Sequence, residues 1–171
     1  MTQASAQAST RANPATGTIV AVCSRAEKGV PKDPQSKVII GEFGVDGDWH
    51  SGPMRTRGDG EVVPNTRHVS IVAKEVFDDL NRELGTDIPM GGFGENILVE
   101  GMGDLAELKA GDVLRFSSGV ELEVTQQNDP CKNLMVYSDL IPKKAYGRRG
   151  VLAIVKTQGA LRPGDTVSVA P

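Results

Sequence analysis

The sequence predicts a mainly β protein: a closed or partly closed β-barrel with one or a few short helices. Seven or eight short apolar or alternating segments are separated by Gly, Asp and Pro turns, and one segment has clear helical periodicity. These strands do not alternate with helices, which disfavours a doubly wound parallel sheet. A barrel is favoured because closing the sheet removes exposed strand edges.

The first half of the chain contains three expected strands and one helix. Residues 18–23 and 37–40 are apolar runs of strand length, and residues 67–72 alternate. Residues 41–60 are rich in glycine and poor in large apolar side chains, so we expect a long loop there. Residues 73–84 are expected to form a helix that ends at a glycine. Its apolar stripe would be Val76, Phe77, Leu80 and Leu84.

The second half contains further short strands. Residues 96–99 and 151–155 are apolar and of strand length. The segments 108–116 and 161–169 both place a Gly-Asp turn before a strand. The first of these is expected to form a hairpin with residues 120–126 through a Ser-Ser-Gly turn.

The size and composition fit one globular domain. We expect a disordered N-terminal tail over residues 1–16 and a single domain over residues 17–171. The net charge of −3 gives no support for bulk binding to nucleic acid or to an anionic membrane, and no apolar run approaches the roughly 20 residues of a membrane span. The two cysteines, Cys23 and Cys131, form no disulfide framework, so we expect a cytoplasmic protein.

Cys131 is the strongest indication of chemistry. Pro130-Cys131 follows an expected strand and precedes residues 132–137, a plausible helical turn. Free N–H groups at a helix N-terminus and the charge of Lys132 both favour a thiolate, which is a soft metal ligand and a nucleophile. The alternative is a buried, inert cysteine, and for Cys23, inside an apolar run, this alternative is favoured.

Two glycine-rich segments could approach a ligand. Residues 41–52 carry Asp46, Asp48 and His50, although a purely structural loop explains them as well. Residues 91–96 would place a glutamate and an asparagine at the mouth of a strand. A zinc site would have to use ligands with no recognised spacing: His50, His68 and Cys131. An anion could be met by basic side chains: Arg67, Lys132, Lys143, Lys144, Arg148 and Arg149.

Six segments, in this order, resemble the MOSC domain, which is the C-terminal domain of molybdenum cofactor sulfurases and also occurs alone in small bacterial proteins. They are Gly44–Gly52, Arg67–Ile71, Glu75, Gly94–Ile97, Gly111-Asp112 and Pro130-Cys131. The resemblance runs from about residue 17 to residue 169.

The resemblance implies a barrel-like fold that binds the molybdenum cofactor (molybdopterin), a pterin phosphate that holds molybdenum through a dithiolene. Cys131 matches the signature cysteine of the family, which is expected to bind molybdenum or to carry sulfur as a persulfide. Pyridoxal phosphate binding is associated with the family as a whole. With Cys131 as the catalytic and metal-binding residue, the expected cofactor-binding residues are Arg67, Glu95, Asn96, Asp48, His50 and Lys132.

The resemblance implies an oxidoreductase that reduces N-hydroxylated compounds. A separate reductase would supply electrons, because the chain has neither a cysteine cluster nor a dinucleotide-binding motif. The alternatives are a sulfur transferase, a non-catalytic carrier of sulfur or of the cofactor, and a plain barrel that binds an anionic ligand. We expect a monomer or homodimer that binds neither nucleic acid nor membrane.

Two features depart from the family pattern. Asn128, three residues before Cys131, stands where the family often has an arginine, so one expected anion contact is missing. The N-terminal β-barrel domain of larger relatives is also missing from this sequence, so a dimer partner would have to cover the pocket, or the cofactor would be more exposed.

Overall fold

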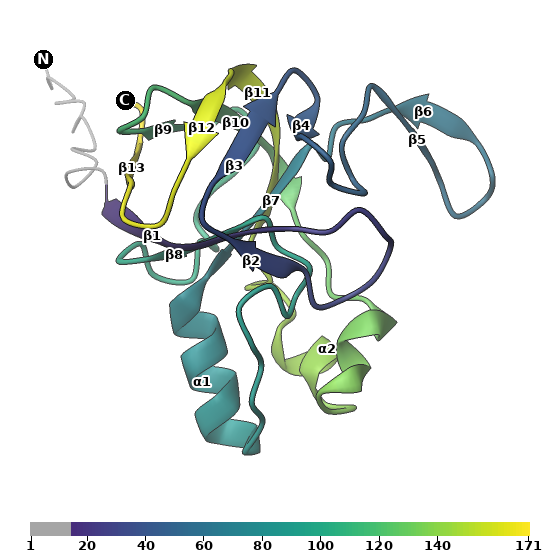
Figure 1. Ribbon diagram of the computed structural model, residues 1–171. Coiled ribbons are helices and arrows are strands. Elements are labelled where there is room, and N and C mark those ends of the chain that lie inside the picture. Colours follow the sequence, from purple (N-terminus) through teal and green to yellow (C-terminus); the bar gives the residue numbers. More distant parts are fainter. Residues whose placement is uncertain (1–14) are drawn as a thin grey trace, which may run out of the picture.

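Seven strands close into a barrel in the computed structural model, which describes residues 15–171 (Figure 1). Around the barrel the order is β13-β9-β10-β11-β7-β8-β1, and β1 pairs again with β13. The predicted mainly β barrel is therefore confirmed. The barrel strands are β1 (Thr16–Ser24), β7 (Val69–Ala73), β8 (Ile97–Glu100), β9 (Val113–Phe116), β10 (Glu121–Gln127), β11 (Val151–Thr157) and β13 (Thr166–Val169).

Pairing in the barrel is antiparallel except between β7 and β8. These two strands run parallel because the helix α1 (Lys74–Leu84) forms part of the crossover between them. The predicted hairpin is present, with Arg115 of β9 opposite Glu121 of β10. The two similar Gly-Asp turns also lead into paired strands, since β9 and β13 are neighbours.

Shorter strands lie outside the closed barrel: β2 (Asp33–Gln35), β3 (Val38–Gly41), β4 (Gly44–Val45), β5 (Met54–Thr56), β6 (Val62–Pro64) and β12 (Gly159–Leu161). β2 extends the barrel sheet beyond β1, β12-β3-β4 form a small sheet, and the β5–β6 hairpin projects from the body (Figure 1). The prediction that residues 41–60 form only a loop is wrong, because β4 and β5 lie within them. Strands of two or three residues are too short to carry a detectable period.

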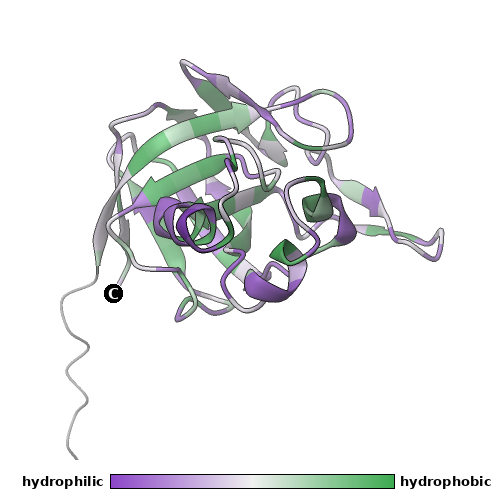
Figure 2. Cartoon of the chain, turned by 90° about the horizontal axis from the view of Figure 1, so that it is seen from below, coloured by the Kyte–Doolittle hydropathy of each residue, from purple (hydrophilic) through white to green (hydrophobic). Residues whose placement is uncertain are grey.

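The expected helix is confirmed as α1, which buries Val76, Phe77 and Leu80, while Leu84 packs partly buried against the core. Gly85 ends it with a φ of 64°. In Figure 2 the helices carry mostly hydrophilic colour, and the barrel strands behind them carry mostly hydrophobic colour. Two short helices follow β10: a 3-10 helix, η1 (Lys132–Val136), and α2 (Ile141–Lys144).

Gly150 fixes how β11 enters the barrel. Its φ is 95°, and a Cβ atom there would lie 2.0 Å from the carbonyl oxygen of Ile71, so a larger residue would push β11 away from β7. The carbonyl of Gly150 also accepts a hydrogen bond of 2.9 Å from the N–H of Asn128. This close approach sets Arg149 beside the end of β10.

The predicted tail, residues 1–16, lies outside the described residues except for its last two, and Thr16 already begins β1. Among residues 15–171, no helix is both long enough and apolar enough to cross a membrane.

Candidate functional site

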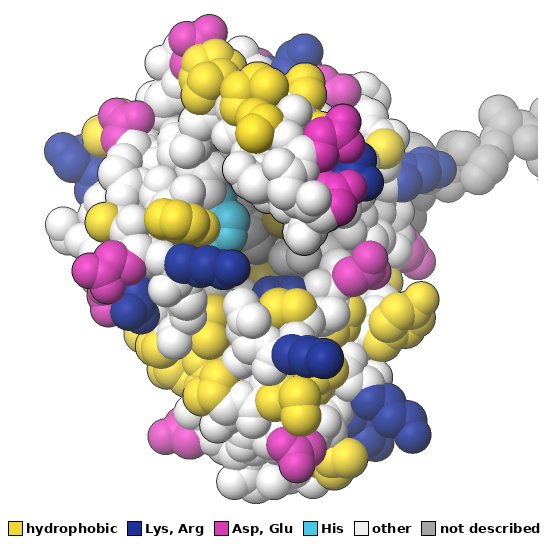
Figure 3. Space-filling view, turned by 90° about the vertical axis from the view of Figure 1, so that its right-hand side faces the viewer, with side chains coloured by type: hydrophobic (Ala, Val, Ile, Leu, Met, Phe, Trp, Pro, Cys, Tyr) yellow, Lys and Arg dark blue, Asp and Glu magenta, His cyan; other side chains and the backbone are white. Residues whose placement is uncertain are grey.

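A cavity of about 220 Å³ opens at the edge of the barrel where β7, β8 and β11 begin and β10 ends. A larger hollow of about 660 Å³ adjoins it beneath the β5–β6 hairpin, and Lys28, His50 and Arg67 line both. The face drawn in Figure 3 shows a hollow bordered by a histidine, basic side chains and apolar side chains. The smaller cavity is also lined by Ser70, Phe93, Gly94, Asn96, Asn128, Asp129, Cys131, Asn133, Arg149 and Leu152.

Cys131 lines this cavity and is partly exposed. It is the N-cap residue of η1, so the predicted helical turn after it is confirmed, as a 3-10 helix. Lys132 is exposed and is not among the residues that line the cavity. Cys23 is fully buried in the core, and burial together with the charge of Glu95 raises the pKa of its thiol to about 12. The two cysteines therefore occupy the contrasting environments expected for a reactive and an inert thiol.

Asn96 connects three barrel strands beneath the cavity. Its side-chain oxygen accepts a hydrogen bond of 3.1 Å from the N–H of Ser70, and its amide nitrogen donates to the carbonyl of Cys23 at 3.1 Å. The hydroxyl of Ser70 is buried and has no hydrogen-bond partner among residues 15–171. An unpartnered buried polar atom costs free energy, so this hydroxyl is available for a ligand.

Arg149 brings a guanidinium group to the cavity, whereas the segment before Cys131 has no arginine. Asn128, which replaces the expected arginine, lines the cavity, and the buried Arg149 lines it as well. Arg149 donates to the carbonyls of Asp129 and Phe93, while its Nε atom is buried and has no partner in the part of the chain that the structure describes. From the sequence, Arg149 was predicted only as one of several possible anion contacts, because no local pattern shows that the start of β11 meets the Cys131 segment.

Arg67 provides a second positive charge at the rim, where it is exposed. Its pKa is lowered by partial burial and by the neighbouring charges of Arg55 and Arg149, while Asp129 opposes these effects. Mutually repelling cations around one opening favour the binding of an anion.

Glu95 lies elsewhere: it is fully buried and does not line the cavity. Its two carboxylate oxygens accept hydrogen bonds from the N–H groups of Gly91 (2.6 Å) and Phe93 (3.0 Å), which holds the glycine-rich turn before β8. Burial raises the pKa of Glu95 to about 7, although these hydrogen bonds favour the charged form. The sequence indicated the turn but not the inward direction of this side chain.

This raised pKa predicts a measurable pH dependence. The folded protein binds a proton at Glu95 more tightly than the unfolded chain, so stability from this group is full below pH 4.5 and declines as the pH rises to about 7. We expect the free energy of unfolding of the wild type, relative to Glu95→Gln, to fall by about 3 kcal/mol from pH 4.5 to pH 7.5. Urea unfolding of both proteins across this range measures the difference. A constant difference would contradict the assignment.

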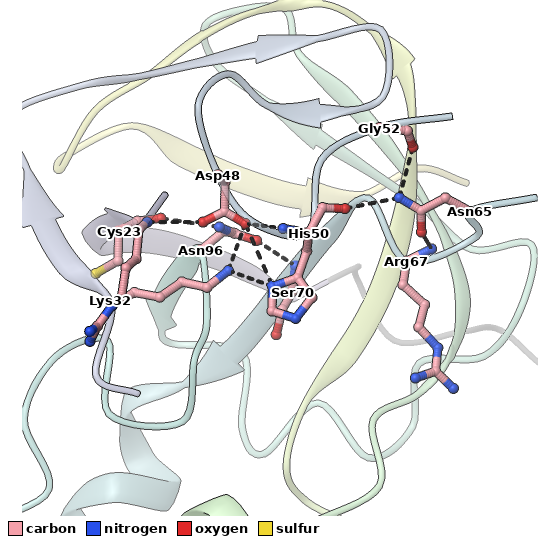
Figure 4. A network of polar contacts seen from close by, with 10 residues as sticks. Cys23, Lys32, Asp48, His50, Gly52, Asn65, Arg67, Ser70 and Asn96 are labelled. Carbon is pink, nitrogen blue, oxygen red and sulfur yellow. Dashed lines mark hydrogen bonds and ion pairs between the residues drawn. The ribbon is translucent and has the colours of Figure 1, made fainter. Parts of the chain in front are cut away.

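Lys32 and Asp48 form a buried ion pair behind the rim, and Lys32 also contacts the partly exposed ring of His50 (Figure 4). The ammonium of Lys32 lies 2.8 Å from a carboxylate oxygen of Asp48, and the two side chains are 1% and 0% exposed. The backbone N–H groups of Arg25 and His50 also donate to Asp48, each at 3.1 Å. Burial alone would raise the pKa of Asp48, but its hydrogen bonds and the charge of Lys32 outweigh burial and hold that pKa well below its usual range.

Sequence reasoning missed Lys32 and Asn65. Asn65 donates to the carbonyls of His50 (2.9 Å) and Gly52 (2.8 Å) and accepts from the N–H of Arg67 at 2.9 Å, so it fixes the rim loop (Figure 4). Neither residue lies in a recognisable motif. Lysine side chains are rarely buried, so the sequence gave no reason to expect that Lys32 is buried.

Comparison with known proteins identifies the family. A family model of the MOSC domain matches residues 46–168. This chain belongs to the MOSC domain family. YuaD of Bacillus subtilis, whose name refers to metal-sulfur cluster biosynthesis, is 33% identical over 147 residues, which cover 74% of this chain and 76% of YuaD.

Solved structures agree with this MOSC fold. The crystal structure of YuaD from Bacillus subtilis superposes with a TM-score of 0.83 at 28% identity, covering 90% of this chain and 95% of that one. YiiM from Geobacillus stearothermophilus has a TM-score of 0.69 at 20% identity, covering 91% of this chain and 75% of that one. YiiM from Escherichia coli has a TM-score of 0.61 at 18% identity, covering 92% and 70%. The two YiiM structures show a shared fold.

The zinc alternative does not assemble in this MOSC domain. His68 is buried, its Nδ1 atom accepts a hydrogen bond of 3.2 Å from the N–H of Val155, and its ring packs edge-on against Phe43. Burial lowers the pKa of His68. Within the part of the chain that the structure describes, no three His, Cys, Asp or Glu side chains are grouped as metal ligands.

Proposed function

We propose that this MOSC protein binds a molybdenum cofactor in the cavity beside Cys131, that the sulfur of Cys131 binds molybdenum, and that the protein reduces N-hydroxylated compounds. The observation that carries this proposal is the position of the Cys131 thiol in a cavity with unpartnered buried polar atoms and a positively charged rim. MOSC domains are associated with the molybdenum cofactor.

The residues present suit such a group. Ser70 and Arg149 offer buried hydrogen-bonding atoms that pair with none of the described residues. Arg67 and Lys28 offer positive charge at the rim to a phosphate. The two adjoining hollows also match the volume of ordinary ligand sites, roughly 300–1,000 Å³. When bound, the cofactor would supply two-electron redox chemistry. The role of the chain is to present a soft thiolate ligand, to hold the phosphate and to position the substrate.

Reduction of an N-hydroxylated compound consumes two electrons and two protons and yields the amine and water. The whole sequence has two cysteines, too few for a Cys₄ iron–sulfur cluster, so a separate reductase would be the electron donor. The free thiols of Cys23 and Cys131 suit a reducing compartment, and we therefore place the protein in the cytoplasm.

A sulfur carrier is the second candidate, because the name of YuaD refers to metal-sulfur cluster biosynthesis. Both functions use the same thiol, but they leave different products. Mass spectrometry of the freshly purified carrier would show one added sulfur atom on Cys131. For the reductase, we expect molybdenum-loaded protein to convert benzamidoxime to benzamidine when a chemical reductant is supplied. Molybdenum-loaded protein that carries a persulfide and does not turn over would favour the carrier.

A substitution of Arg67 tests whether its positive charge strengthens binding of the anionic cofactor. No ion pair holds its side chain within residues 15–171, so Arg67→Met removes a charge with little expected loss of stability. We expect cofactor to bind about 10- to 100-fold more weakly, as for a lost hydrogen bond to a charged group. Molybdenum retained after stepwise dialysis measures this. Arg115→Met, which removes an exposed arginine on β9, should behave as wild type. Equal retention by Arg67→Met and wild type would contradict this role.

A further inference from the structure

Lys32 is the least expected member of the site, because it buries an ammonium group that the loop does not need. Asp48 already accepts hydrogen bonds from the N–H groups of Arg25 and His50, so a neutral neighbour could have replaced Lys32 in a purely structural loop. Burying a lysine and an aspartate as ions costs more than burying apolar side chains of similar size. Lys32 also has a second contact, 3.1 Å from Nδ1 of His50.

The second contact determines where His50 carries its proton. A lysine ammonium has three donors and no acceptor, so the Nδ1 atom of His50 must accept from it. A neutral imidazole with an acceptor at Nδ1 has its proton on Nε2. The side chain of His50 is 51% exposed and lines both hollows, so this N–H is presented on the ligand side, away from Lys32 (Figure 4).

We propose that Lys32 and Asp48 are positioning residues that hold His50 as an Nε2–H donor, and that a proton passes from Lys32 through His50 to an oxygen atom of the ligand. This deepens the proposed function and rests on it, since reduction of an N-hydroxyl group needs protons at oxygen. His50 is the catalytic residue of the three, because it alone lines the cavity.

The transfer balances with bulk water as the source of the replacement proton. The Nε2–H bond of His50 breaks as an O–H bond forms on the ligand, while an Nζ–H bond of Lys32 breaks as an Nδ1–H bond forms. The imidazole stays neutral and only changes tautomer, Lys32 becomes a neutral amine, and Asp48 remains a carboxylate. A proton from bulk water then adds to Nε2 of His50 while the proton on Nδ1 returns to Lys32, which restores the resting state. Burial lowers the pKa of Lys32, although Asp48 opposes it, which helps this ammonium to release a proton.

The resting tautomer can be tested directly by NMR, without cofactor or substrate. In ¹⁵N-labelled wild-type protein at neutral pH, long-range ¹H–¹⁵N spectra of the His50 ring should show a protonated Nε2 and an unprotonated Nδ1. In Lys32→Met, the nearest remaining partner is the Asp48 carboxylate, 3.7 Å from Nδ1, which is an acceptor. The proton should therefore move to Nδ1. An Nδ1–H tautomer in the wild type, or an unchanged tautomer in a folded Lys32→Met protein, would overturn the proposal.

A second variant tests the proton transfer and does not depend on the folding of Lys32→Met. His50→Phe keeps the Lys32–Asp48 ion pair, and its turnover of benzamidoxime per bound molybdenum should be at least 100-fold slower than that of the wild type, as expected for a lost proton donor. Wild-type turnover in His50→Phe overturns the proton transfer and leaves the proposed function intact. A wild type without molybdenum overturns the proposed function and the transfer with it, whereas the NMR result still decides the role of Lys32.

Discussion

Asp48→Ala is expected to destabilise the protein by about 3–5 kcal/mol, because it leaves the ammonium of Lys32 buried without its counter-ion. The variant also removes the acceptor of two backbone N–H groups, those of Arg25 and His50. Urea unfolding at neutral pH measures the loss. The loop that contains Asp48 also forms the rim of the cavity through His50. The variant should therefore become susceptible to proteolysis at a lower urea concentration than the wild type.

The chain contains a matched control for this prediction. Lys74 and Asp78 on α1 form an ion pair of almost the same length, 2.7 Å against 2.8 Å, but their side chains are 38% and 54% exposed. Asp78→Ala should therefore cost at most about 1 kcal/mol. Similar losses in the two variants would mean that the Lys32–Asp48 pair is accessible to water.

Cys131→Ser is expected to keep the fold and to lower reductase activity at least about 1000-fold, the scale seen when an essential active-site group is removed. A hydroxyl is a harder ligand than a thiolate and ionises far less readily, so it replaces the sulfur in size but not in metal binding. Benzamidoxime turnover with a chemical reductant measures the effect.

Cys23→Ala is the control for loss of a thiol elsewhere. Cys23 is buried in the core and is not among the residues that line the cavity, so this variant should lose some stability and keep its activity per bound molybdenum. Activity in Cys131→Ser equal to that of the wild type would exclude Cys131 as the catalytic residue.

The barrel was predictable because most of its strands are long enough to carry a period. β10 alternates polar and apolar residues from Glu121 to Thr125, and α1 has a continuous stripe that it buries. The strands β4 to β6 were not predictable, since two or three residues carry no period and their pairing depends on neighbours far along the chain.

The site was predictable where a motif is local and not where the fold assembles it. Cys131, Arg67, Asn96 and His50 were expected from their motifs and the structure gathers them around one cavity. Asp48 and Glu95 came from the same motifs but support the surrounding loops. Arg149 lies at the site because of how β11 enters the barrel, and Lys32 lies there because it is buried beside Asp48. Both placements depend on tertiary packing.

The molybdenum and pterin content of the protein purified from a molybdenum-replete host, with Cys131→Ala purified in parallel, tests the central claim most directly. We expect near-stoichiometric molybdenum and pterin in the wild type and loss of molybdenum in the variant. The absence of molybdenum from both proteins, in a host shown to make the cofactor, would contradict a molybdenum site at Cys131.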